Sequence, residues 1–223
     1  MNQFKKIVAL GICCLSITFS QAQFTKANND PDADFKTAKE YLQREQFSLA
    51  YPIFKNIYNN GIAESAFPVT LQLEAKYYSV VCGLKLNDAS SEPLAAEFIS
   101  LEHNAPRVQM MSFYLAEYYY RQRKFGDANN YYAKATIDNL TNNEIASMKF
   151  HQAYGFFTLQ DFAKAKPLFN AIRQLPEDPN YMDANYYYGF ISFYEKNYKQ
   201  ALESFKVVEA SPAYKNLVPF YIA

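Results

Sequence analysis

The chain has 223 residues, and its 22 basic side chains balance 22 acidic ones. This balance gives no electrostatic footprint for nucleic acid, whose binding normally needs a basic stripe. Half of the residues are hydrophobic but only 6 are glycine, which argues against disorder, a β-sandwich, a β-barrel and a Rossmann-type phosphate loop.

Residues 1–22 have the three parts of a cleavable export signal. A pair of lysines precedes an apolar stretch at residues 7–19, which is shorter than the roughly 20 residues of a membrane-spanning helix. The small residues Ser20 and Ala22 predict cleavage between Ala22 and Gln23. We therefore expect an exported protein whose mature part has no transmembrane span and begins with a short linker over residues 23–30.

The cysteines favour a protein that is held together by packing alone. Cys82 is the only cysteine after the predicted cleavage site, so no internal disulfide can form. Cys13 and Cys14 lie inside the apolar stretch, and neither follows the small residue that lipoprotein processing prefers. A lipoprotein is therefore the less favoured alternative.

One phrase recurs along the mature chain: an aromatic residue, an alanine three positions later and a second aromatic four positions further on. Its copies are Phe47, Ala50 and Phe54; Phe125, Ala128 and Tyr132; Phe162, Ala165 and Phe169; and Tyr198, Ala201 and Phe205. A degenerate copy has Leu94 in the place of the alanine and ends at Phe98. Spacings of three, four and seven residues place side chains on one face of a helix.

A second small residue lies twelve positions before each of these sites. These residues are Ala38, Cys82, Ala116, Ala153 and Gly189. Two antiparallel helices approach closely only where the facing side chains are small, and aromatic rings fill the space beside the contact. The pattern therefore predicts about five helical hairpins, at residues 31–64, 70–104, 108–140, 143–178 and 181–214.

Helix ends and connectors are also marked in the sequence. Thr141 and Glu144 have the spacing of a capping box, and Asp161 can cap the helix that follows it. Residues 59–68 are expected to form an extended connector. Prolines that would break a helix are expected between the units, at Pro106, Pro179 and Pro212.

The third unit carries the clearest resemblance to a known family. Residues 115–119, Leu-Ala-Glu-Tyr-Tyr, are followed by Phe125, Ala128, Tyr132 and Ala135. This pattern resembles the tetratricopeptide repeat, although the chain lacks the family's tryptophan, has Ser192 in place of its tyrosine in the fifth unit and lacks the alanine in the second.

The resemblance covers about residues 31–216 and implies an all-α fold, a right-handed α-α superhelix of about five helical hairpins. Residues 217–223 have the pattern of the first helix of a further, truncated repeat. Repeat arrays need a polar terminal cap, so we expect the N-terminal part of a longer array. The alternative is a short hydrophobic tail that folds back on the fifth unit.

In tetratricopeptide proteins the first helix of each unit lines a concave groove. The resemblance carries this role to Phe113, Glu117, Tyr120 and Arg121 in the third unit, to Phe150, Tyr154, Phe157 and Thr158 in the fourth, and to Tyr186, Phe190, Phe193 and Tyr194 in the fifth. Such a groove would be aromatic and would suit an extended peptide or an amphipathic helix. The alternative is that these rings pack against neighbouring repeats.

No pattern in the sequence indicates chemistry. His103 and His151 have no ligand spacing around them, and nucleophile elbows, P-loops and zinc motifs do not occur. We therefore expect neither catalysis nor a bound cofactor or metal. The basic cluster of Arg121, Arg123 and Lys124 is interpreted as a solvated helix end.

The resemblance and the leader together predict a non-enzymatic protein–protein interaction scaffold in the cell envelope, periplasmic or associated with the outer membrane. It is similar to the periplasmic tetratricopeptide proteins that organise outer-membrane assembly or secretion machinery. Its partner would be a protein or peptide and not a nucleic acid. One alternative is the sensory or ligand-binding front end of a larger membrane signalling protein. A lesser alternative is a glycan-binding groove.

Overall fold

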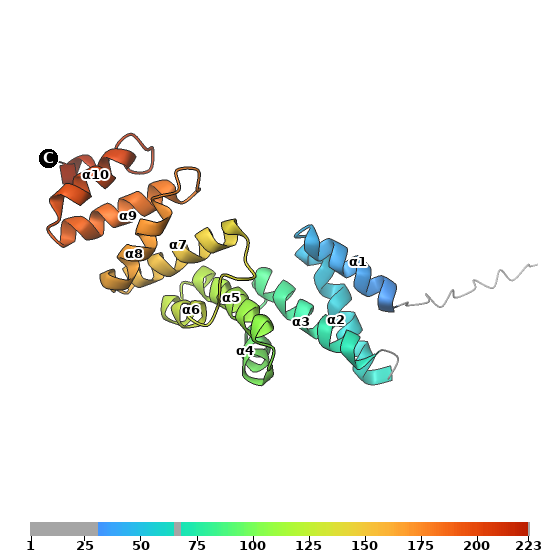
Figure 1. Cartoon of the computed structure of the whole chain (residues 1–223). Helices are drawn as coiled ribbons and strands as arrows, with labels where there is room; N and C mark the ends of the chain where they lie inside the picture. Colours follow the sequence, from blue (N-terminus) through green and yellow to red (C-terminus); the bar gives the residue numbers. More distant parts are fainter. Residues whose placement is uncertain (1–30, 65–67, 223) are drawn as a thin grey trace, which may run out of the picture. The chain divides into compact units, whose positions relative to one another are not determined.

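The computed structural model describes residues 31–64 and 68–222, and within these ranges every regular element is a helix (Figure 1). The expected leader and the linker that follows it lie outside the described residues. The helices are α1 (Pro31–Gln43), α2 (Phe47–Glu64), α3 (Val69–Lys85), α4 (Ser91–Leu101), α5 (Ala105–Arg121), α6 (Phe125–Tyr132), α7 (Asn142–Thr158), α8 (Phe162–Ile172), α9 (Tyr181–Tyr194), α10 (Tyr198–Val208) and α11 (Pro219–Ile222). The all-α prediction is confirmed. None of the described helices is both long and apolar enough to cross a membrane.

Each helix from α1 to α10 packs on the next along the chain. The small residues predicted at the crossings are buried, as are the aromatic residues that end each full copy of the repeated phrase. Among these are Ala38 and Ala50, Ala116 and Ala128, Ala153 and Ala165, and the rings of Phe54, Tyr132, Phe169 and Phe205. Neighbouring helices therefore meet at small side chains, where their backbones can come close together, and a buried aromatic ring packs beside the contact.

The second hairpin departs from the predicted register. Ser91 and Ala95 are buried against α3, whereas Leu94 is only partly buried. The turn before α4 spans residues 86–90, two residues longer than the turn before α6, and this rotates the buried face of α4. Leu94 therefore does not take the place of the alanine. Gly83 lies so close to Ser91 that an added Cβ would come within 1.9 Å of its hydroxyl oxygen.

Two predicted breaks are helical. The helix α2 runs on to Glu64, so the connector expected over residues 59–68 is much shorter. Asparagine and glycine lower helix propensity by about 1 kcal/mol or less, which the packing of α2 along α3 outweighs. Pro106 lies in the first turn of α5 and not in a connector, because the backbone N–H that proline lacks has no helical partner at that position.

The predicted caps are present. The Thr141 side chain accepts a hydrogen bond from the Glu144 backbone N–H, and the Glu144 carboxylate accepts from the Thr141 N–H, which completes a capping box on α7. Asp161 caps α8 through the Lys164 N–H.

The turn inside each hairpin contains a left-handed residue that is not glycine. These residues are Glu45, Asn87, Arg123, Gln160 and Lys196, with φ between 56° and 63°. At the α7–α8 turn, the Gln160 N–H donates to the Phe157 carbonyl and the Asp161 N–H donates to the Phe156 carbonyl, both at 2.9 Å. This is the Schellman arrangement that satisfies the last carbonyls of a helix.

Two helical glycines differ in the space around them. A Cβ added to Gly189 in α9 would lie 2.9 Å from the buried Phe205 ring and 3.2 Å from Ser204 in α10, whereas one added to Gly126 in α6 would meet nothing within 4 Å. Gly189 is therefore required for the α9–α10 crossing, and Gly126 is not required by packing.

We expect Gly189→Ala to destabilise the fold by about 1–3 kcal/mol, because the fully buried Phe205 ring must move. Gly126→Ala is the matched control and is expected to stabilise by up to about 1 kcal/mol through helix propensity. Urea denaturation followed by circular dichroism measures both. Equal effects of the two substitutions would contradict a close α9–α10 crossing.

Candidate functional site

A pocket of about 530 Å³ lies between α7 and α9, beside the start of α8. We call it the α7–α9 pocket; it is lined by Tyr154, Phe157, Thr158, Gln160, Phe162, Tyr187, Phe190 and Tyr194. None of these side chains is charged, and six of the eight are aromatic. The pocket is therefore an uncharged aromatic surface.

The lining rings hold one another in place. Phe157 lies at the centre of the group, with its ring centroid 4.9 Å from Tyr187, 5.5 Å from Phe162 and 5.6 Å from Phe190. Tyr194 meets Phe162 edge to face at 5.1 Å and remains 67% exposed. The pocket thus has an internally packed floor and an open tyrosine at its rim.

Polar groups at the rim are available for a ligand. The Thr158 hydroxyl donates to the Tyr154 carbonyl at 2.9 Å. Across residues 31–64 and 68–222, the side-chain amide of Gln160 and the Tyr194 hydroxyl make no hydrogen bond. The pocket therefore has two hydrogen-bond donors at its rim, the Gln160 side chain and the Tyr194 hydroxyl, that have no partner in the described chain.

Five of the predicted groove residues line this pocket: Tyr154, Phe157, Thr158, Phe190 and Tyr194. The sequence analysis missed Gln160, Phe162 and Tyr187 as lining residues. Phe162 opens the repeated phrase of the fourth unit and Tyr187 stands in the middle of a tyrosine run, so both are visible in the sequence as aromatic positions. Their exposure to the pocket depends on how adjacent hairpins pack.

Other predicted groove residues serve packing. Phe113 and Phe150 are buried in hydrophobic clusters, so their rings are not available to a partner. Tyr186 stacks on Tyr214 at 4.2 Å. Phe193 is partly exposed but contacts Tyr221 at 5.2 Å. At these positions most of the ring surface packs against other parts of the chain, as the alternative in the sequence analysis predicts.

Glu117 and Tyr120 belong to a contact between repeats that we call the Glu117 cluster. Glu117 accepts a hydrogen bond of 2.6 Å from the Tyr132 hydroxyl, and its carboxylate oxygens lie 2.9 and 3.1 Å from Nδ1 of His151. The Tyr120 ring stacks on the His151 ring at 3.9 Å. The cluster joins α5, α6 and α7, so His151 has a structural role that its spacing in the sequence does not reveal.

Electrostatics keep Glu117 ionised. Burial raises the pKa of its carboxyl, but the hydrogen bonds from His151 and Tyr132 and the charge of Arg121 outweigh burial and hold the pKa below its ordinary value. Burial and the adjacent carboxylate raise the pKa of the Tyr132 phenol, which therefore remains a hydrogen-bond donor.

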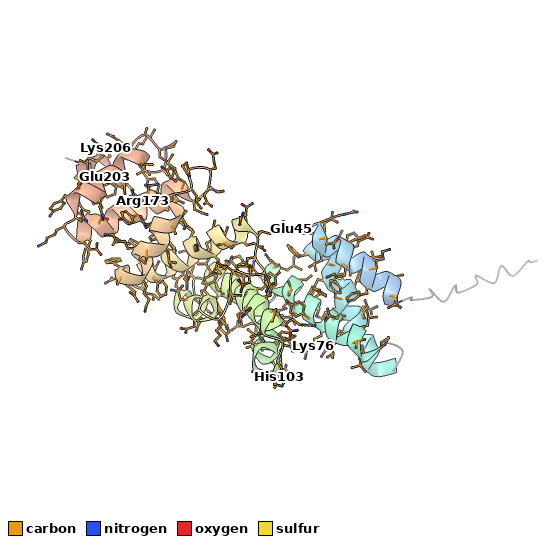
Figure 2. All side chains as sticks on the ribbon, in the orientation of Figure 1. Glu45, Lys76, His103, Arg173, Glu203 and Lys206 are labelled. Carbon is orange, nitrogen blue, oxygen red and sulfur yellow. The ribbon has the colours of Figure 1, made fainter. Side chains whose placement is uncertain are left out.

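Arg121 and His103 lie apart from the pocket. Arg121 donates to the Leu84 carbonyl at 2.6 Å and to the Asn87 side chain at 3.0 Å, so it fastens the turn of the preceding hairpin rather than only ending a solvated helix. His103, labelled in Figure 2, lies in the exposed connector between α4 and α5. Among the described residues, no three His, Cys, Asp or Glu side chains are placed to hold a metal ion.

We expect Glu117→Gln to lower the free energy of unfolding at pH 7 by about 1.5–3 kcal/mol, because the hydrogen bonds to a charged, buried acceptor are weakened. A carboxyl whose pKa is lower in the folded than in the unfolded chain stabilises the fold above the unfolded pKa, and this contribution disappears as the pH falls through the folded pKa. The difference between variant and parent should therefore shrink below about pH 4.5.

Urea denaturation at several pH values between 7 and 3 checks this prediction. Glu203→Gln, at an exposed carboxylate on α10, is the control and should change the unfolding free energy by less than about 0.5 kcal/mol. A Glu117→Gln variant with the same pH profile as the parent would show that the Glu117 cluster carries no ionised carboxylate.

Comparison with known proteins identifies the repeat. No family model and no curated protein sequence matches the chain. Among solved structures, MamA of AMB-1 is similar with a TM-score of 0.60 and 17% identity, covering 85% of this chain and 97% of the solved MamA chain. A mutant form of MamA also has a TM-score of 0.60, with 16% identity over 79% of this chain and 94% of the mutant.

A putative kinesin light chain from Podospora anserina, with nearly identical TPR-like repeats, has a TM-score of 0.54 and 12% identity, covering 83% of this chain and 95% of its own. At such identities the likeness concerns the fold. Together with the buried crossings of small residues and the order of the hairpins, it confirms the resemblance that the sequence shows: the chain has a tetratricopeptide-type repeat fold.

Proposed function

We propose that the chain is a non-enzymatic protein-interaction scaffold, exported to the cell envelope, and that its α7–α9 pocket receives a segment of a protein partner. The observation that carries this proposal is the uncharged aromatic lining with a tyrosine open at the rim. Tyrosine is enriched among the residues that dominate binding at interfaces, because it offers a large apolar ring with a polar tip.

The size of the pocket supports a short segment as the bound element. A volume of about 530 Å³ falls in the range of sites that enclose small ligands or a few side chains, about 300–1,000 Å³. A whole domain would need a much larger contact surface. The pocket therefore suits a few consecutive residues of a peptide, with the rest of the repeat array available for further contacts.

The proposed location rests on the leader. Residues 1–22 combine a basic start, an apolar stretch and small residues before Gln23. We expect N-terminal sequencing of the protein recovered from the envelope fraction to begin at Gln23. A retained or acylated leader would overturn a periplasmic, cleaved form, and recovery of the protein only from the cytoplasm would overturn export.

The pocket itself is tested by substitution. We expect Tyr194→Ala combined with Phe157→Ala to weaken binding of a partner captured from envelope extracts by about tenfold or more, because an exposed anchor and the floor are both removed. Affinity is measured with the purified partner by titration calorimetry.

Tyr198→Ala is the matched control, because Tyr198 is 59% exposed on α10 and does not line the pocket. Phe157 is partly buried, and removal of a fully buried phenylalanine ring costs about 3–5 kcal/mol. Thermal unfolding must therefore first show that the double variant is folded, and Tyr194→Ala alone serves if it is not. Unchanged partner binding in a folded variant would remove the pocket from the proposed function.

A further inference from the structure

We propose that the α7–α9 pocket binds an uncharged, proline-rich segment in the polyproline II conformation. This inference rests on the proposed function and names the chemistry of the partner segment. It is carried by three features of the pocket: its lack of charge, its unpaired hydrogen-bond donors and the arrangement of its rings.

The lack of charged side chains in the pocket argues against a charged peptide as its ligand. No lysine, arginine, aspartate or glutamate lines the pocket, so an acidic or basic motif would lose its hydration there without gaining an ion pair. A segment that carries no charged side chain incurs no such cost. The complementary partner is therefore uncharged along the residues that enter the pocket.

The rim donors distinguish an extended segment from a helix. The Gln160 amide has N–H groups to donate, and the Tyr194 hydroxyl can donate one more hydrogen bond; neither group has a partner in the described chain. In an α-helix all carbonyls except the last four already accept backbone hydrogen bonds. In polyproline II the backbone makes no internal hydrogen bonds, so every carbonyl can accept. Only the extended segment would use these donors along its length.

The rings are arranged as walls. Tyr194 and Phe162 meet at an interplanar angle of 68°, and Phe157 and Phe190 meet at 75°. Each pair is in edge-to-face contact, with centroids 5.1 and 5.6 Å apart, so the rings give the pocket walls of different orientation instead of one flat platform on which a sugar ring would stack. A polyproline II helix repeats every three residues, about 9 Å apart, and presents compact pyrrolidine rings that dock between aromatic side chains.

Conformational entropy favours the same partner. Proline fixes φ near −65° before binding, so a proline-rich segment loses less freedom on docking than a flexible chain of equal length. The pocket is already held by contacts among its own rings, such as Phe157 with Tyr187 at 4.9 Å. Both sides are therefore preorganised.

The full chain without its leader can be titrated into a Trp-tagged decaproline peptide. The chain contains no tryptophan, so the fluorescence of the peptide's tryptophan reports binding without interference. A Trp-tagged Gly-Ser peptide of the same length, a Trp-tagged amphipathic Leu/Lys helix and unlabelled chitohexaose as a competitor separate the possible ligands. We expect decaproline to bind at least about tenfold more tightly than the other two peptides, and chitohexaose not to displace it.

Two pairs of variants locate the binding. Gln160→Gly removes the rim amide and keeps a left-handed backbone that glycine favours; Lys196→Gly makes the same change in the α9–α10 turn, away from the pocket. We expect Gln160→Gly to weaken decaproline binding by about fivefold, the equivalent of one hydrogen bond, and Lys196→Gly to leave it unchanged. Tyr194→Ala should weaken it by about tenfold and Tyr198→Ala should not.

Each other outcome overturns the inference. Preferential binding of the helix, equal binding of the Gly-Ser peptide, displacement by chitohexaose, or decaproline binding that is insensitive to both Gln160→Gly and Tyr194→Ala all contradict a polyproline II segment in this pocket. If decaproline fails but a partner from envelope extracts still depends on Tyr194, the inference is wrong and the proposed function stands. If neither binds, both are wrong.

Discussion

The close contact of two helices at a pair of small side chains determines the rest of this structure. In the third hairpin the pair is Ala116 and Ala128, both fully buried, with the Tyr132 ring sealing the contact one turn further on. Where Gly189 replaces alanine, the Phe205 ring fills the space that a Cβ would occupy. Because backbones this close leave no room for large side chains between them, the aromatic residues are displaced to the flanks of each crossing. There they either join the next hairpin or face outward.

The hairpin turns complement these crossings without using glycine. Each turn has a non-glycine residue in the left-handed region, at a cost of about 1 kcal/mol relative to glycine. Since tertiary packing of the helices outweighs that cost, the chain can place polar side chains at turn positions. Gln160 is such a case, because the left-handed residue that follows α7 also lines the α7–α9 pocket. The scarcity of glycine is therefore part of how the pocket acquires a polar rim.

Spacing in the sequence predicts most of the fold because the crossing contacts are local: Ala38 and Ala50 lie only twelve residues apart and both are buried. Prediction fails where a non-local contact decides the outcome. The helix α2, which packs along α3, extends to Glu64. A local feature also misleads at Leu94, which leaves the crossing because a longer turn rotates α4. The family pattern places Phe113 at the groove, but its burial depends on the neighbouring hairpin.

The α5–α7 junction differs in chemistry from the α7–α9 junction, where the aromatic pocket lies. At the earlier junction His151 stacks on Tyr120 and pairs with Glu117, so a polar cluster occupies the space between successive first helices. At the later junction rings occur at positions such as Phe157 and Phe190. There the Phe157 ring meets the Tyr187 and Phe190 rings, with centroids 4.9 and 5.6 Å apart. The α7–α9 pocket therefore lies where aromatic rings take the place of a hydrogen-bonded polar cluster, and this is why its surface is aromatic and uncharged.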